Sequence, residues 1–214
     1  MEKTKHYLLA TILFVIVAFA GCSKGDDDDD DQTPTPTPTP VTVNSAPQVT
    51  GLMDGAAFSW VTGGVSAYQS TLSSDGSIAI PPDESDFILG AGIENALNGK
   101  YMDFNMGTFS FVTPSDTSDL KTFFHIGVWP YSDQAVNGVQ IRYVDGNGDF
   151  WSTDEFPADQ TGSTFTITER KALVNGGDNY MKIKASFKCK LYNGFGDVKN
   201  ITGGTVVATF WCEY

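Results

Sequence analysis

The chain has 214 residues, of which 41% are hydrophobic, 13% aromatic and only 18% charged. This apolar content excludes a disordered protein. The formal net charge of -13 argues against nucleic acid as a partner, because an acidic surface repels phosphate backbones.

The N-terminus has the pattern of a secretory signal. Lys3 and Lys5 precede the apolar run 7–20, which is too short to span a bilayer and ends in small residues. The sequence Phe-Ala-Gly-Cys that ends at Cys22 resembles a bacterial lipobox, in which the cysteine thiol is alkylated with diacylglycerol. We therefore expect a signal peptide over residues 1–21 and a lipid anchor on Cys22, such as palmitate, that makes the membrane a partner. An ordinary signal followed by a chance cysteine is the alternative.

Residues 22–45 are expected to be a linker. Six aspartates, Asp26–Asp31, cannot fold on their own, and the Thr-Pro repeat at 33–40 favours a stiff polyproline II stalk. The lysine-then-aspartate order resembles the export signal that places Bacteroidetes lipoproteins on the outer face of the outer membrane. A plain solvated spacer is the alternative.

Residues 46–214 are expected to form one all-β domain, because short alternating segments are separated by Asp-Gly and Asn-Gly turn signals. We expect a two-sheet antiparallel β-sandwich, jelly-roll or Ig-like, with about ten strands and at most one short helix, at Ser115–Phe124. The alternative is a closed lipocalin-like β-barrel. The predicted strands are Val49–Met53, Ala56–Trp60, Tyr68–Leu72, Ser77–Ile80, Phe87–Ile93, Tyr101–Val112, Val139–Val144, Phe150–Thr153, Ser163–Thr168, Tyr180–Tyr192 and Thr205–Cys212.

Alternation within the strands assigns their faces. In Tyr180–Tyr192 the apolar residues fall on one side, and four lysines fall on the other, where they form a solvated surface or, alternatively, a site for an anionic glycan. In Tyr101–Val112 the apolar phase changes at Gly107, which predicts a β-bulge or bend there.

Part of the domain resembles a group of small uncharacterised Bacteroidetes surface lipoproteins. The resemblance implies a β-sandwich on a lipidated stalk and supplies no catalytic residue. It is carried by Gly138–Tyr143, Trp151–Thr153, Gly162–Thr168 and Phe187–Tyr192.

The chain has three cysteines. Because Cys22 is expected to be lipidated, Cys189 and Cys212 are the two that could form a disulfide. A hairpin between the last two strands places Cys189 opposite Val206 and Cys212 opposite Ile183. These positions are too far apart for a disulfide, so two free thiols are favoured over a bridge.

Catalytic patterns are sparse. The domain has one histidine, His125, which argues against a histidine-based metal site or a Ser-His-Asp triad. Carboxylates for a glycoside hydrolase are available, but none is marked by its context. They are Asp103, Asp133, Asp154, Glu155 and Asp159. We expect no cofactor.

Asp145, Asn147 and Asp149 place oxygen ligands at alternate positions and are weak candidates for calcium. The sixth position of such a loop is Phe150 instead of glycine, and the twelfth is Phe156 instead of an acid. A hairpin turn is therefore the favoured interpretation.

Three aromatic residues are candidate ligand contacts. Trp129 and Tyr131 flank a proline in an expected loop, and an even-length turn would place Trp151 on the outer side of its hairpin. Exposed aromatic rings on a rigid β-sandwich stack against sugar rings. The alternative is that Trp129 plugs one end of the sandwich and that Trp151 packs under a loop or against the aliphatic stem of Arg142.

These observations together predict a surface-exposed outer-membrane lipoprotein that acts as a non-enzymatic binding module for a glycan or another cell-surface component. A structural or adhesive subunit with a protein partner is the second hypothesis, and a carboxylate-dependent glycoside hydrolase is the third. A concave aromatic site rimmed by carboxylates would favour the glycan, and an exposed apolar edge strand would favour the adhesive subunit.

Overall fold

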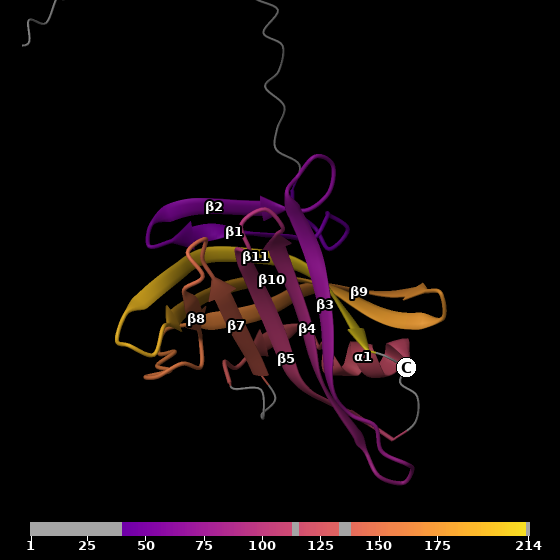
Figure 1. The fold of residues 1–214 in the computed structure, drawn as a ribbon. Helices are drawn as coiled ribbons and strands as arrows, with labels where there is room; N and C mark the ends of the chain where they lie inside the picture. Colours follow the sequence, from indigo (N-terminus) through magenta and orange to yellow (C-terminus); the bar gives the residue numbers. More distant parts are fainter. Residues whose placement is uncertain (1–39, 113–115, 133–137, 213–214) are drawn as a thin grey trace, which may run out of the picture. The chain divides into compact units, whose positions relative to one another are not determined.

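A computed structural model describes residues 40–112, 116–132 and 138–212, so Cys22, Asp133 and the aspartate run lie outside the described residues. The described part contains eleven strands and one short helix (Figure 1). In chain order they are β1 (Gln48–Met53), β2 (Ala56–Val61), β3 (Tyr68–Ser77), β4 (Ser85–Asn95), β5 (Tyr101–Phe111), α1 (Thr117–Phe123), β6 (Gly127–Trp129), β7 (Gly138–Val144), β8 (Phe150–Ser152), β9 (Thr164–Asn175), β10 (Asp178–Tyr192) and β11 (Val198–Cys212).

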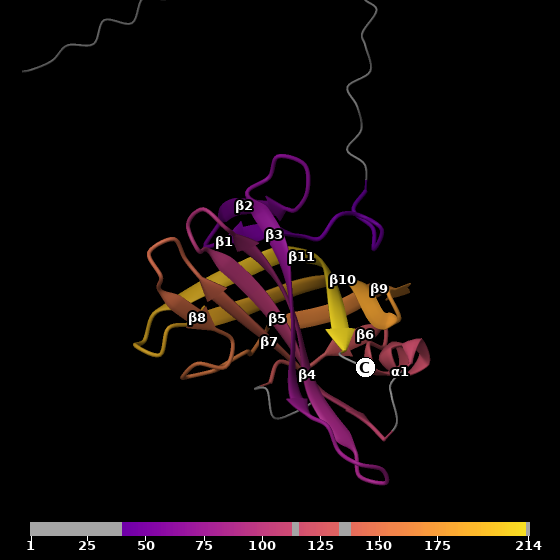
Figure 2. The same ribbon diagram turned by 45° about the vertical axis from the view of Figure 1, so that its right-hand side comes forward.

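The eleven strands form one antiparallel sheet. Its order is β2-β1-β11-β10-β8-β7-β5-β4-β3, and β9 pairs with both β10 and β6. The sheet curls over itself, so that β3, β4, β5 and β7 cross over β9, β10 and β11 in both views (Figures 1 and 2). Strand β11 accordingly contacts β3 and β4 across the core. The all-β prediction with one short helix is confirmed, in the form of a curled half-barrel that combines features of a sandwich and a barrel.

Strands β2 and β3, at the two ends of the main strand order, meet through aromatic rings. The ring of Trp60 on β2 stacks on that of Tyr68 on β3, with centroids 5.5 Å apart and planes at 12°. Trp60 also contacts Tyr143 of β7, with centroids 6.0 Å apart. Ring packing therefore holds the edges of the curled sheet together where the backbone ladder does not continue.

The core lies on the inner face of the curl, and alternation fixes which residues enter it. The predicted apolar side of β10 is buried at every position from Met181 to Leu191. A slip of one residue would turn these side chains to solvent, so the register is strongly specified. The largest fully buried side chains are Phe104, Phe124, Phe165, Phe210, Leu89, Ile93, Met102, Met106, Leu120, Ile141, Ile167 and Met181.

The bulge expected at Gly107 is present. Leu89 pairs with Met106 and Phe87 pairs with Phe109, so two residues of β5 lie opposite one residue of β4. The extra residue explains the change of apolar phase, because Met106 and Phe109 both face the core.

Helix α1 also agrees with the sequence. Asp116 caps it by accepting hydrogen bonds from the backbone N–H groups of Ser118 (2.6 Å) and Asp119 (3.0 Å). Leu120 is its buried residue, and Arg170 of β9 donates to the carbonyls of Lys121 and Phe124 at its C-terminal end. These hydrogen bonds satisfy carbonyls that a helix end leaves without partners.

Two sequence expectations about turns and register are wrong. Asp75-Gly76 is not a hairpin turn, because β3 continues through it and both residues pair with β4. In the last hairpin, Cys189 lies opposite Ile201 and Cys212 lies opposite Asn179, ten positions away along β10. The residues predicted to lie opposite the two cysteines were therefore incorrect. The two cysteines are nevertheless too far apart along the strands for a disulfide, and Cys189 is a free buried cysteine.

The chain segment before β1 is fixed to the lysine side of β9 and β10. Lys182 Nζ donates to the Ser45 carbonyl at 2.7 Å, and Lys171 Nζ donates to Asn44 Oδ1 at 2.8 Å. Glu169 accepts a hydrogen bond from the Val43 N–H at 2.9 Å, and it also forms an ion pair with Lys184 at 2.8 Å. Part of the lysine face therefore binds the chain's own entry segment.

Candidate functional site

Trp129, on β6, is a core residue. Only 4% of it is exposed, so the prediction that it is a solvent-accessible ligand contact is wrong. Its ring stacks under that of His125 (4.7 Å between centroids) and contacts Phe123 edge-on at 5.4 Å. Its Nε1 donates to the His125 carbonyl at 3.1 Å. Pairing of β6 with β9 places it beside Phe165 under α1, so Trp129 closes one end of the core.

Trp151, on β8, also faces inward, and 7% of it is exposed. The loop between β7 and β8 has an odd length, residues 145–149, so Trp151 pairs with the inward Tyr143 instead of with Arg142 or Val144. The expected even-length turn was wrong by one residue, which reverses the face. Lys199 lies over the indole ring, with Nζ 4.0 Å from its centroid.

Tyr131 is half-buried and lies just after Trp129. Its hydroxyl is 3.2 Å from the Thr164 carbonyl and 3.1 Å from the Lys188 carbonyl, and burial raises the pKa of Tyr131 well above its usual value. These bonds fix the ring against β9 and β10. The three predicted ligand residues therefore do not form one exposed platform, and both tryptophans are buried.

The weak calcium candidates form a hairpin turn. The side chain of Asp145 accepts hydrogen bonds from the N–H groups of Asn147 at 2.9 Å and Asp149 at 3.2 Å. Within the described residues, no cluster of three or more metal-ligating side chains is present. The oxygen of Asp145 is thus used to hold the turn.

A concave surface lies at the loops beside Trp151, and we call it the loop basin. It has a volume of about 680 Å³, and its lining comes from the β10–β11 loop and from β8 with its flanking segments. Figures 1 and 2 show this loop beside β8. Pairing of Tyr192 with Ser152 brings these distant segments together. The residues lining it are Asp149, Phe150, Trp151, Glu155, Asn193, Gly194, Phe195 and Asp197.

The wall of the loop basin contributed by residues 193–197 is held by Asn193. Its Oδ1 accepts from the N–H groups of Phe195 at 2.9 Å and Asp197 at 3.1 Å, and its Nδ2 donates to Asp197 Oδ2 at 2.9 Å. This arrangement leaves Phe195 94% exposed at the rim. Phe150, on the adjoining strand, is also exposed. Large exposed rings on a fixed loop are available to a ligand.

The rim of the loop basin is acidic. In the described part of the chain, the ion pairs join Lys184 to Glu169 and Lys190 to Asp159. Neither pair includes one of the three acids of the rim, Asp149, Glu155 and Asp197.

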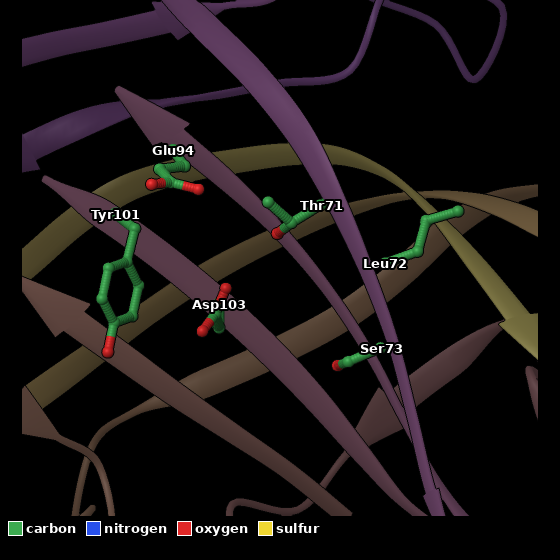
Figure 3. A pocket seen from close by; sticks show the side chains of 6 residues that line it. All are labelled: Thr71, Leu72, Ser73, Glu94, Tyr101 and Asp103. Carbon is green, nitrogen blue, oxygen red and sulfur yellow. The ribbon is translucent and has the colours of Figure 1, made fainter. Parts of the chain in front are cut away.

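A second, smaller concavity of about 330 Å³ lies on the outer face of β3, β4 and β5 (Figure 3). Its floor is glycine: an added Cβ at Gly92 would collide with Asp103 Oδ1 and approach Thr71 Oγ1 to 2.6 Å. We call it the strand groove. It is lined by Thr71, Leu72, Ser73, Glu94, Tyr101 and Asp103.

Asp103 is the perturbed acid of the strand groove. Burial raises the pKa of Asp103, the positive charge of Arg142 opposes that shift, and the negative charge of Glu94 adds to it. The strand groove thus holds two carboxyl groups, and burial raises the pKa of one of them, Asp103.

The remaining candidate acids within the described residues have structural partners or belong to the loop basin. Asp154 accepts from Gln140 and Ser152, and Asp159 forms an ion pair with Lys190 at 2.8 Å. Hydrogen bonds from Lys190 and Thr161 hold the pKa of Asp159 well below its usual range.

Sequence reasoning missed Asn193, Phe195 and Asp197. Their segment, Asn-Gly-Phe-Gly-Asp, places one aromatic residue between two glycines in a hairpin loop, where no strand face can bury it. That was a usable signal. Their proximity to Trp151 depends on the pairing of β8 with β10, strands that are not consecutive, and no local pattern encodes it.

Comparison with known proteins adds no relative: no protein-family model, curated protein or solved structure matches the chain. None of the helices in residues 40–112, 116–132 and 138–212 has the length and apolarity that a membrane span needs.

Proposed function

We propose that this chain is a lipid-anchored, surface-exposed binding module of the outer membrane, and that it binds a glycan in the loop basin. The observation that carries the proposal is the composition of this basin. Exposed Phe195 and Phe150 offer apolar faces for a sugar ring, while the carboxylates and Asn193 at the rim can bond its hydroxyl groups. A concave aromatic site with an acidic rim is the feature that favours a glycan ligand over an adhesive subunit with a protein partner.

The edge strands give less support to an adhesive subunit. Strand β3 exposes mainly serine, threonine and glutamine side chains, with Leu72 its one exposed large apolar residue. Strand β2 is short, and its exposed large apolar residue is Val61. A protein partner that adds a strand would find few apolar side chains along β3, whereas β2 is mostly apolar but only six residues long.

A glycan array tests the binding function, with Phe195→Ala as the site variant. We expect loss of binding to the glycan found with the unmodified chain, and an unchanged unfolding midpoint, because this ring is 94% exposed. Phe156→Ala is the matched control, since Phe156 is also an exposed phenylalanine (79%) but does not line the basin. Equal binding by both variants would refute the site.

The anchor is tested separately. Cys22→Ser should abolish detergent partitioning and lipid labelling, and proteinase added to intact cells should remove the domain of the unmodified protein. Unchanged partitioning of the variant would refute lipidation, and protection in intact cells would refute surface display.

One observation favours a second candidate, the carboxylate-dependent glycoside hydrolase. Asp103, with its raised pKa, and Glu94 line the same groove as Tyr101 (Figure 3). Release of reducing ends from a polysaccharide panel, abolished by Asp103→Asn and not by Asp83→Asn, would support it. No release by the unmodified chain would exclude it for that panel.

A further inference from the structure

We propose that Asn175, at the turn between β9 and β10, is a site of spontaneous modification, where the folded chain converts asparagine to aspartate and isoaspartate. The proposal is independent of the ligand, because it concerns the reactivity of the chain itself. Asn-Gly pairs favour this reaction, since glycine has no side chain to hinder attack by its backbone nitrogen. Asn137 of one pair lies outside the described residues, and the four described pairs begin at Asn98, Asn147, Asn175 and Asn193.

The reaction uses one group from each residue of the pair. The backbone nitrogen of the glycine loses its proton to hydroxide and attacks the side-chain carbonyl carbon of the asparagine. A carbon–nitrogen bond forms as the bond to the side-chain nitrogen breaks, and that nitrogen takes a proton from water and leaves as ammonia. Water then opens the resulting succinimide at either carbonyl, which gives aspartate or isoaspartate. A hydrogen bond to the glycine N–H or to the asparagine carboxamide slows the reaction, because it has to break first.

The attacking nitrogen is engaged in two of the four pairs. Gly99 donates its N–H to the Asn95 carbonyl at 2.9 Å, and Gly148 donates its N–H to the Asp145 carbonyl at 3.0 Å. These glycines belong to the pairs that begin at positions 98 and 147. Both pairs are therefore protected by the fold.

In the pair that begins at Asn193, the carboxamide is engaged instead. Its Nδ2 donates to Asp197 Oδ2 at 2.9 Å, and its Oδ1 accepts from the N–H groups of Phe195 at 2.9 Å and Asp197 at 3.1 Å. Ring closure expels Nδ2 and changes the position of Oδ1, so it breaks these bonds. The same hydrogen bonds that hold the wall of the loop basin therefore protect it from this reaction.

Asn175 has neither restraint in the described part of the chain. Its side chain is exposed and takes part in no hydrogen bond there, and the N–H of Gly176 takes part in none either. Asn175 pairs with Asp178 across a two-residue loop, Gly176-Gly177, in which both residues have positive φ (64° and 100°). Exposure also admits the hydroxide and water that the reaction consumes. Asn175 is therefore the reactive member of the four.

The product changes the end of the hairpin and spares the core. Aspartate at position 175 places a second carboxylate opposite Asp178, and isoaspartate adds a methylene group to the backbone at a tight turn. The adjoining Val174 is 65% exposed, so this segment contributes little to the core. The domain should therefore carry the modification without unfolding.

The test incubates the full-length chain at mildly alkaline pH and follows the four pairs by peptide mapping with mass spectrometry. Asn175 should convert about tenfold faster than each of the other three. In urea sufficient to unfold the chain, the four rates should become similar, because the hydrogen bonds that distinguish them are lost. Conversion of another described pair as fast as Asn175 in the folded chain would overturn the proposal. A lead of Asn175 that persists unchanged in urea would also overturn it, because the cause would then lie in the local sequence.

The protection of Asn193 is tested by Asp197→Ala, which removes the acceptor of its Nδ2. The rate at Asn193 should rise severalfold, with Asn175 in the same sample as the reference. The matched control is Asp149→Ala, which removes another carboxylate of the loop basin that does not bond to Asn193. An unchanged rate at Asn193 in Asp197→Ala, or an equal rise in both variants, would overturn the argument that hydrogen bonds set the order of reaction.

Discussion

The two inward tryptophans offer a direct test of the packing described for the two ends of the core. Trp129 and Trp151 are buried to similar extents, 4% and 7% exposed. The indole N–H of Trp129 donates to the His125 carbonyl at 3.1 Å, whereas that of Trp151 has no acceptor among the described residues. Replacing each by phenylalanine removes about the same amount of ring, so the variants differ in the hydrogen bond of Trp129 and in the contact of Trp151 with Lys199 Nζ, 4.0 Å from its ring centroid.

The magnitudes follow from this difference. Shortening an indole to a phenyl ring removes roughly 40 Å² of buried apolar surface, about 1 kcal/mol, in either variant. Trp129→Phe also loses a hydrogen bond with a net value of about 1 kcal/mol, so we expect a loss of about 2 kcal/mol. Trp151→Phe removes an unsatisfied donor that costs about 1 to 3 kcal/mol, so we expect a change near zero or a gain in stability.

Urea unfolding of the two variants, followed by circular dichroism, measures both changes, and equal slopes against denaturant confirm that the unfolded states are comparable. The alanine variants supply a check on burial, since each should cost about 3 to 5 kcal/mol. Equal losses for Trp129→Phe and Trp151→Phe, or a larger loss for Trp151→Phe, would refute the hydrogen-bond accounting.

Three further predictions concern other parts of the domain. Asp103→Asn should raise stability at pH 7. Burial raises the pKa of Asp103 in the folded state above its unfolded value of 3.8. The stability that the Asp103 carboxyl contributes is therefore present below pH 3.8 and is lost as the pH rises through the folded-state pKa. Unfolding from pH 3 to 7 checks this, and a steeper loss in the variant would contradict it. Gly204→Ala should cost about 1 to 3 kcal/mol, because an added Cβ lies 2.7 Å from the buried ring of Phe187; a thermal midpoint equal to that of the unmodified chain would show that this ring can move. Lys182→Met should release the entry segment by removing the hydrogen bond to the Ser45 carbonyl. Faster amide exchange at residues 42–46 with an unchanged core is the expected result, and unchanged exchange would show that the other contacts suffice.

Alternation predicted much of the fold. In β10 the odd positions from Met181 to Leu191 are buried as expected, because a strand with lysines on one side and apolar residues on the other has only one register that keeps the charges hydrated. The phase change at Gly107 predicted the bulge for the same reason. The turn at Asp54-Gly55 connects β1 and β2 as its sequence indicates.

The failures have specific physical causes. Asp75-Gly76 favours a turn locally, but pairing with β4 extends the strand through it, so tertiary context overrides propensity. Trp151 was assigned to the wrong face because the parity of its hairpin loop cannot be inferred from Asp-Gly-Asn-Gly-Asp, and one residue reverses every side chain. The loop basin depends on the pairing of β8 with β10, which the sequence does not reveal.

The fixed entry segment determines how the domain bears mechanical load. A pull on the chain before β1 loads the contacts of residues 43–45 with β9 and β10 before it reaches β1 at Gln48, whereas a pull on the β10–β11 loop enters β11 at Val198. Because Gln48 pairs with Val207, the two points of attack lie nine residues apart along β11, about 30 Å, and the forces on the paired strands point in opposite directions along their length. The β1–β11 ladder is therefore sheared, with its hydrogen bonds loaded together, and is not unzipped one bond at a time.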